Sequence, residues 1–193
     1  MIVPSINLNL FNSKVDLAPA PVEEKTEAPA LGVPTKSRIR LGISETLFSH
    51  AGGAIPIITA LAGSPFLQAK SNGSDLVVLG DADGEPVAVI ERAAGNTFTI
   101  YTSHGQVPLA EVTQSGKVLN VIMEGQSDPM YTIHKVSAHP TRTFPTKHII
   151  RKEGKVVAST RYGQGNSYML SVNAGADPCL MTCLATIADE INV

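Results

Sequence analysis

The residues whose types could support chemistry are two cysteines, five histidines and one acidic turn. Cys179 and Cys183 stand four residues apart, so on a helix their side chains lie one turn apart and both project outward. A disulfide between them would strain the helix, and no second Cys/His cluster completes a metal site. We interpret the pair as buried small hydrophobic residues in a protein of a reducing compartment.

The histidines and the acidic turn do not form a recognisable catalytic or metal site. The segment DADGEP starts at Asp81 like a calcium loop, but Arg92 occupies the position where such a loop needs a bidentate Glu. The chain has no Gly-x-Ser-x-Gly elbow, no Walker loop and no GxGxxG. We therefore predict no enzyme, no catalytic residue, no metal and no cofactor. The histidines are scattered singly, without zinc-ligand spacing: His50, His104, His134, His139 and His148.

A local excess of basic residues is the clearest functional signal. Between His134 and Arg161 the chain has seven Lys or Arg and one acidic residue, Glu153, although its net charge is −2. One interpretation is a set of solvated strand ends, because Lys147 and Lys152 have opposite parity on a strand and cannot share a face. The other is a site for anionic phospholipid or phosphoinositide around the KEGK turn, where each cation near an anionic leaflet would contribute about 1 kcal/mol.

The lipid-binding residues expected under the second interpretation are Lys147, Arg151, Lys152 and Lys155. Nucleic acid is not expected as a partner, because this segment has few aromatic residues on which bases could stack.

The C-terminal stretch AGADPCLMTCLATIADEINV predicts the element that organises the fold. Asp177 is a suitable N-cap residue, and the run to Ala188 is apolar around the whole helical circumference. At about 1.5 Å per residue this run is roughly 16 Å long, about half of a hydrocarbon core of ~30 Å, so it cannot span a membrane. We predict a helix over 177–190 that is enclosed by protein, with its structural core at Asp177, Leu180, Leu184 and Ile187.

Asp189 and Glu190 stand at the end of this predicted helix, where the helix macrodipole disfavours negative charge by about 0.3–1 kcal/mol. We expect an Arg or Lys at the rim of the surrounding structure, or strand N–H groups, to compensate them. Their role would then be structural.

The residues from Ile39 onward predict an enclosing barrel. Short β-rich runs alternate with Gly-containing turns about every ten residues, which is typical of an all-β sandwich or barrel. Several runs, such as 76–79, are apolar on both faces, which a one-sided surface sheet would not be. The predicted fold is mainly β, a closed antiparallel barrel around the apolar C-terminal helix. Strands are expected near 66–70, 75–79, 86–91, 97–102, 108–113, 118–123, 131–136, 147–151, 155–160 and 167–172.

The composition, with 43% hydrophobic and 17% charged residues, indicates a globular protein with one domain and an extension. Residues 1–37 are rich in Pro, Ala and Glu, and we expect a disordered or loosely docked arm before a domain at 38–193. Within the arm, INLNLF suits either a short docked strand or a free tail. The N-terminus lacks a basic n-region, so we expect a cytoplasmic protein that can be peripheral to membranes.

A hairpin with the Gly-containing turn KEGK leads to the step Gly175-Ala176-Asp177 and then to an apolar helix that ends in Asp189-Glu190. This order resembles the tubby C-terminal-like superfamily, in its LURP-one-related and phospholipid-scramblase branch. The resemblance implies a twelve-stranded barrel around a central C-terminal helix, with the two further strands in RIRLGIS and AIPIITAL. The palmitoylated cysteine cluster and the calcium segment of scramblases are missing, and no residue-by-residue match carries over the lipid site of tubby proteins.

The function that we expect is a non-enzymatic, tubby-like domain that binds phosphoinositide or other anionic lipid at a membrane periphery, or acts as an interaction module. The alternatives are scramblase-like phospholipid translocation and a purely protein-binding regulatory domain, which would contact partner proteins through the N-terminal arm.

Overall fold

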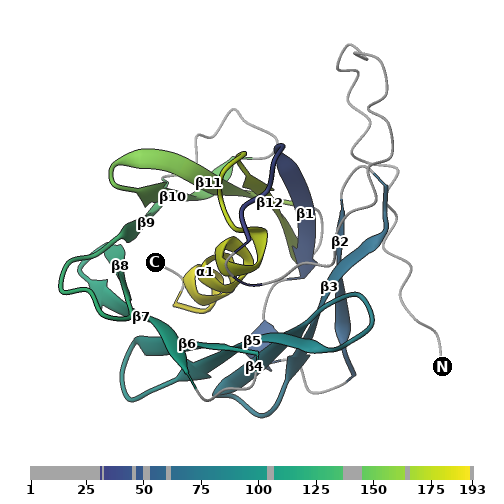
Figure 1. The fold of residues 1–193 in the computed structure, drawn as a ribbon, viewed down its shortest axis with the longest axis horizontal. Coiled ribbons are helices and arrows are strands. Elements are labelled where there is room, and N and C mark those ends of the chain that lie inside the picture. The colour runs from purple at the N-terminus through teal and green to yellow at the C-terminus, as the bar shows by residue number, and fades with distance from the viewer. Residues whose placement is uncertain are drawn as a thin grey trace.

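The computed structural model describes residues 31, 33–44, 47–49, 53–59, 62–103, 107–136, 145–163 and 166–191. Its strands form one closed antiparallel barrel in which each strand pairs with its neighbours in sequence and β1 pairs with β12 (Figure 1). The strands are β1 Ile39–Ser44, β2 Ile55–Thr59, β3 Pro65–Ser71, β4 Leu76–Gly80, β5 Pro86–Arg92, β6 Thr97–Thr102, β7 Pro108–Ser115, β8 Val118–Met123, β9 Tyr131–Lys135, β10 Thr146–Lys152, β11 Lys155–Tyr162 and β12 Ser167–Val172. The short 3-10 helix η2 spans Leu47–Ser49, and the helix α1 spans Pro178–Ile191.

The predicted fold class is confirmed: the protein is mainly β, with a closed barrel and one C-terminal helix. The strands expected from the Gly-containing turns correspond to β3 to β12, and the two further strands lie in RIRLGIS and AIPIITAL as β1 and β2.

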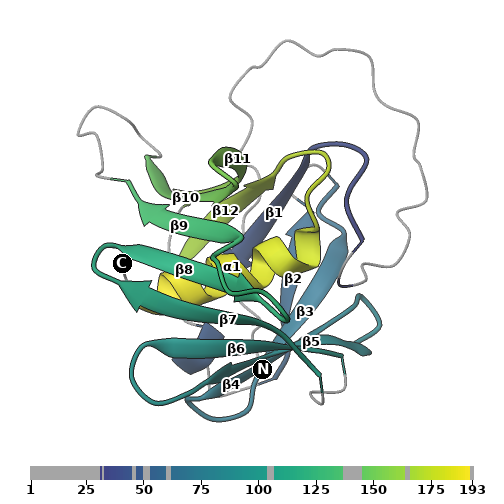
Figure 2. The same ribbon diagram turned by 60° about the vertical axis from the view of Figure 1, so that its left-hand side comes forward.

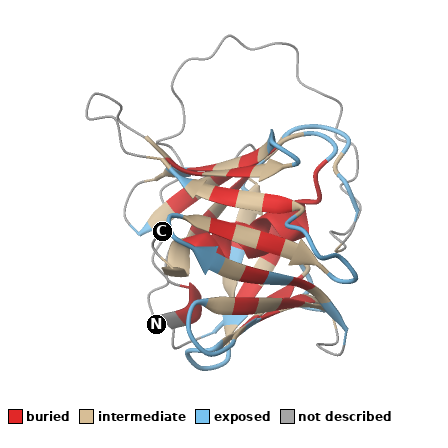
Figure 3. Ribbon diagram, turned by 90° about the vertical axis from the view of Figure 1, so that its left-hand side faces the viewer, coloured by how far each residue is buried: buried red, intermediate tan, exposed pale blue. Residues whose placement is uncertain are grey.

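Burial alternates along the strands, as the two-residue period of a strand requires (Figure 3). In β4, Val77 and Leu79 are fully buried inside the barrel, whereas Leu76 and Val78 face outward and are half-buried. Val78 is directly opposite Val89 of β5, so these outward valines shield each other from water. This accounts for the runs that are apolar on both faces.

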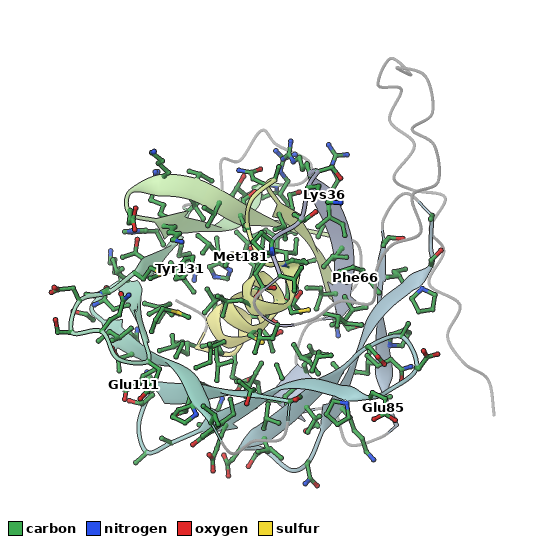
Figure 4. The ribbon with its side chains drawn as sticks, in the orientation of Figure 1. Lys36, Phe66, Glu85, Glu111, Tyr131 and Met181 are labelled. Carbon is green, nitrogen blue, oxygen red and sulfur yellow. The ribbon has the colours of Figure 1, made fainter. Side chains whose placement is uncertain are left out.

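The helix α1 lies inside the barrel along its length (Figures 1 and 2). Every residue from Pro178 to Ala188 is buried, and Leu184 and Ile187 have no exposed surface. Burial of each large apolar side chain contributes about 1.5–3 kcal/mol, so the helix is a major part of the hydrophobic core. In Figure 4, the side chain of Met181 lies within the barrel.

The start of α1 is fixed by its N-cap residue. Asp177 Oδ1 accepts hydrogen bonds from the backbone N–H of Cys179 at 2.8 Å and of Leu180 at 3.2 Å. Gly175, with φ of +84°, turns the chain from β12 toward the barrel interior. Residues 1–30 of the predicted arm lie outside the described residues, but Thr35 bonds the β12–α1 connection: its N–H donates to Ala176 O, and its carbonyl accepts from Gly175 N.

The two ends of the barrel differ in chemistry. We call the end where α1 begins, at Asp177, the N-cap end, and the end where it finishes, at Asp189 and Glu190, the carboxylate end. The antiparallel order places the β4–β5, β6–β7, β8–β9 and β10–β11 connections at the N-cap end.

Replacing Leu184 with Asp should abolish the fold, because a buried carboxylate without a partner costs several kcal/mol against a total stability of about 5–15 kcal/mol. The matched control is Val107→Asp, since Val107 is 57% exposed. Thermal unfolding followed by circular dichroism should show a cooperative transition near that of the parent for the control and none for Leu184→Asp. Similar melting curves for the two variants would contradict an enclosed helix.

Candidate functional site

The basic segment recognised in the sequence forms β10 and β11, and two β-bulges decide where its side chains point. Thr146 pairs with Arg161 and His148 pairs with Thr160, which leaves Lys147 as an extra residue on β10. A bulge interrupts the alternation of side chains, so the consecutive residues Lys147 and His148 are both buried. The bulge therefore turns Lys147 into the barrel.

Inside the barrel, Lys147 compensates the end of the helix. Its ammonium group pairs with the carboxylate of Asp189, and both side chains are less than one-tenth exposed. The Nζ atom also lies 5.1 Å from the ring centroid of Tyr162 and 5.7 Å from that of Tyr168, within cation–π range. The structure thus separates Lys147 from the other three residues expected to bind lipid.

The second acidic residue of the helix end is compensated in the same way. Arg92 of β5 pairs with Glu190, and its guanidinium lies 5.3 Å from the ring centroid of Phe48 and 5.2 Å from that of Phe98. These two pairs confirm the expectation that Arg or Lys at the barrel rim would offset the carboxylates. The role of both carboxylates in this arrangement is structural.

Arg151, Lys152 and Lys155 come together at the tip of the β10–β11 hairpin, at the N-cap end. Lys152 and Lys155 are paired residues of the hairpin, and Lys152 Nζ lies 5.7 Å from the ring centroid of Tyr131. Arg151 donates a hydrogen bond of 3.0 Å to the carbonyl of Gly154, which ties its guanidinium to the turn. Burial raises the pKa of Tyr131, and the nearby charges of Asp177 and Glu153 raise it further.

The second bulge lies beside this cluster. Ile150 pairs with Ala158 and Arg151 pairs with Val156, which leaves Val157 as an extra residue on β11. Simple alternation along β11 would point Val156 into the barrel. The bulge turns it outward, so Val156 is 42% exposed and lies directly opposite Arg151.

Closure of the barrel adds basic residues that the sequence analysis did not include in the site. Because β1 pairs with β12, Arg40 lies on the same side of the barrel as β11, and Lys36 and Arg38 precede it. The sequence shows these cations as a basic run at the start of β1. Only the pairing of β1 with β12 brings that run close to the β10–β11 hairpin. We call the exposed or half-exposed cations of this side the basic arc: Lys36, Arg38, Arg40, Arg151, Lys152, Lys155 and Arg161.

Charge is sorted around the barrel. In the described parts of β1, the β10–β11 hairpin, β12 and residues 33–38, Glu153 is the one acidic residue. In Figure 4, Lys36 lies on the opposite side of the barrel from Glu85 and Glu111. The acidic residues on β4 to β8 and their described connections are Asp75, Asp81, Asp83, Glu85, Glu91, Glu111, Glu124 and Asp128.

Two thiols and one histidine also lie in the barrel interior. Burial raises the pKa of the Cys179 and Cys183 thiols above their ordinary value of 9.0, so both are protonated at neutral pH. His148 bonds Thr160 Oγ1 through its backbone N–H at 3.0 Å, with its ring Nδ1 3.2 Å from the same oxygen. His50, His104, His139 and Arg142 lie outside the described residues.

Among the residues that the structure describes, no group of three or more His, Cys, Asp or Glu could hold a metal ion. The turn at Asp81 is a hydrogen-bonded loop: its Oδ1 accepts from the N–H groups of Asp83 and Glu85, each at 2.9 Å.

The fold is a tubby-like barrel, and it is similar to the X-ray structure of a protein from Arabidopsis thaliana. That likeness has a TM-score of 0.62 and 15% sequence identity, and it covers 83% of this chain and 94% of the other. A family model described as LURP-one-related matches residues 39–189, so the chain belongs to the LURP-one-related family. No curated protein sequence matches the chain significantly.

Removing one partner of the Lys147–Asp189 pair should destabilise the protein strongly, because truncating a buried ion pair leaves an uncompensated charge and typically costs roughly 3–5 kcal/mol. We expect this for Lys147→Met in urea unfolding. The exposed control Lys155→Met should stay within about 0.5 kcal/mol of the parent.

The double variant Lys147→Met with Asp189→Leu should recover much of the lost stability, since neither charge of the pair is then left buried without its partner. If Lys147→Met unfolded at the same urea concentration as Lys155→Met, Lys147 would not be an internal counter-ion.

Proposed function

We propose that this LURP-one-related domain is a non-enzymatic module that docks on anionic phospholipid through the basic arc. The observation that carries the proposal is the sorting of exposed charge: cations from two stretches distant in the sequence, residues 36–40 and 151–161, meet on one side of a barrel whose other side is acidic. A negatively charged surface would attract the first side and repel the second, which fixes the orientation of docking.

Arg151, Lys152 and Lys155 form the centre of the proposed contact. Their positions on a tight hairpin at the N-cap end allow them to approach a flat surface together. Each suitably placed cation contributes about 1 kcal/mol near an anionic leaflet, so the arc supplies enough attraction for reversible binding. Lys147 takes no part, because it is buried against Asp189.

Lipid suits the arc better than nucleic acid. Tyr131, the ring that Lys152 covers, is 8% exposed and so does not offer a face on which a base could stack. No helix in the described part of the chain is long and apolar enough to cross a membrane. Docking through the basic arc does not need a membrane-spanning helix. The family supports a non-enzymatic domain, and the buried, neutral thiols and paired carboxylates agree with that.

The test is sedimentation of the protein with vesicles of phosphatidylcholine alone, with added phosphatidylserine, or with added phosphoinositide. We expect the variant Lys152→Glu with Lys155→Glu to lose binding to both anionic vesicles. The control is Lys70→Glu with Lys117→Glu, which makes the same change in net charge at two exposed lysines outside the arc. It should bind nearly as well as the parent.

Salt should have the same effect as the charge reversal, because raising ionic strength from about 0.1 M to 1 M shortens the Debye length from ~10 Å to ~3 Å. Equal losses in the two double variants would show that only net charge matters and would contradict docking through the arc. If the parent ignored anionic vesicles at low salt, the protein-binding alternative would replace the proposal.

A further inference from the structure

We infer that the basic arc contacts the bilayer itself, with Val156 and Val33 entering the headgroup layer, so that the partner is a membrane rather than a soluble polyanion. This inference rests on the proposed function. It adds an apolar component that electrostatic docking alone does not require.

Three large apolar side chains are exposed in the described part of the chain: Val33 at 53%, Val107 at 57% and Val156 at 42%. All three lie at the N-cap end. Val33 precedes Thr35, which is bonded to Gly175 and Ala176; Val107 lies in the β6–β7 connection; and Val156 belongs to the β10–β11 hairpin. Singly exposed valines are common on protein surfaces, so Val156 and Val33 indicate a contact only through the cations that lie beside them.

Val156 is held outward by a rigid local structure. The bulge at Val157 reverses its facing, and the side-chain amide of Asn173 donates a hydrogen bond of 3.0 Å to the Val156 carbonyl. The turn itself is tight, with positive φ at both central residues, +48° at Glu153 and +81° at Gly154. A preorganised tip of this kind loses little conformational entropy on binding.

The charges around the three valines separate them into two groups. Val156 is next to Lys155 and opposite Arg151, and Val33 is three residues from Lys36, all cations of the arc. The β4–β5 connection, which is next to that of Val107 in strand order, carries Asp81, Asp83 and Glu85, and the β8–β9 connection, which lies between that of Val107 and the β10–β11 hairpin, carries Glu124 and Asp128. An anionic membrane would therefore attract the hairpin and residues 33–38 and repel the region of Val107. Val107 is the matched control.

The chain contains no tryptophan, so a single substitution provides a site-specific fluorescent reporter. We expect Val156→Trp emission to shift to the blue on phosphatidylserine vesicles and to be quenched when their acyl chains are brominated. Val107→Trp should sediment with the same vesicles without either change. Inositol hexakisphosphate, a soluble polyanion, should leave the emission of both variants unchanged.

A second pair of variants tests the energetic role without a large ring. Val156→Asn should weaken vesicle binding about five- to tenfold, because only the 42% of Val156 that is exposed is left to be buried in the bilayer, whereas Val107→Asn should not weaken it. Thermal melting of all four variants checks that the fold is intact.

The outcomes separate the inference from the proposal on which it rests. If Val156→Trp sediments with anionic vesicles but its emission neither shifts nor is quenched, the docking stands and the insertion is wrong. If inositol hexakisphosphate shifts the emission as vesicles do, the site recognises a soluble polyanion and the insertion is again wrong. If the parent does not sediment at all, both ideas fail.

Discussion

Exclusion of water from an apolar helix is the constraint on which the rest of the structure depends. The helix α1 is apolar on every side, so it is stable only where protein surrounds it completely. A twelve-stranded barrel has the complementary difficulty, because its interior is wider than strand side chains alone can fill. The barrel therefore encloses the helix and the helix fills the barrel, so neither is expected to be stably folded without the other.

The ends of this helix determine which charged residues remain for function. At its start, Asp177 caps the backbone from within the barrel. At its end, Asp189 and Glu190 draw Lys147 and Arg92 into structural pairs. Lys147 is buried, and Arg92, although its side chain is 28% exposed, is held by Glu190 and two aromatic rings. Most of the other cations in the described residues belong to the basic arc, and their concentration on one side is what makes a binding function physically reasonable.

The sequence was sufficient to predict the strands and the helix for identifiable reasons. Gly-containing turns such as Glu153-Gly154 mark hairpins, and the absence of charge from Cys179 to Ala188 excludes a solvent face. The facing of Lys147 and Val156 could not be predicted. Simple alternation predicts that Lys147 and Lys152 lie on opposite faces, but a bulge is a shift in register that leaves no mark in residue type. The addition of Arg40 to the arc likewise depends on barrel closure, a contact between residues distant in the sequence.

The most direct test of the enclosed helix uses its own thiols. Cys179 and Cys183 have no exposed surface, and burial raises the pKa of each, so they should react with a thiol reagent only when the barrel opens. The measurement is the labelling rate of both cysteines in the native protein as urea is increased, compared with the rate of global unfolding measured by circular dichroism. The account predicts that labelling is never faster than global unfolding at any urea concentration, and that the two rates coincide where labelling is faster than refolding. Rapid labelling without urea, at a rate close to that of an exposed thiol, would contradict it.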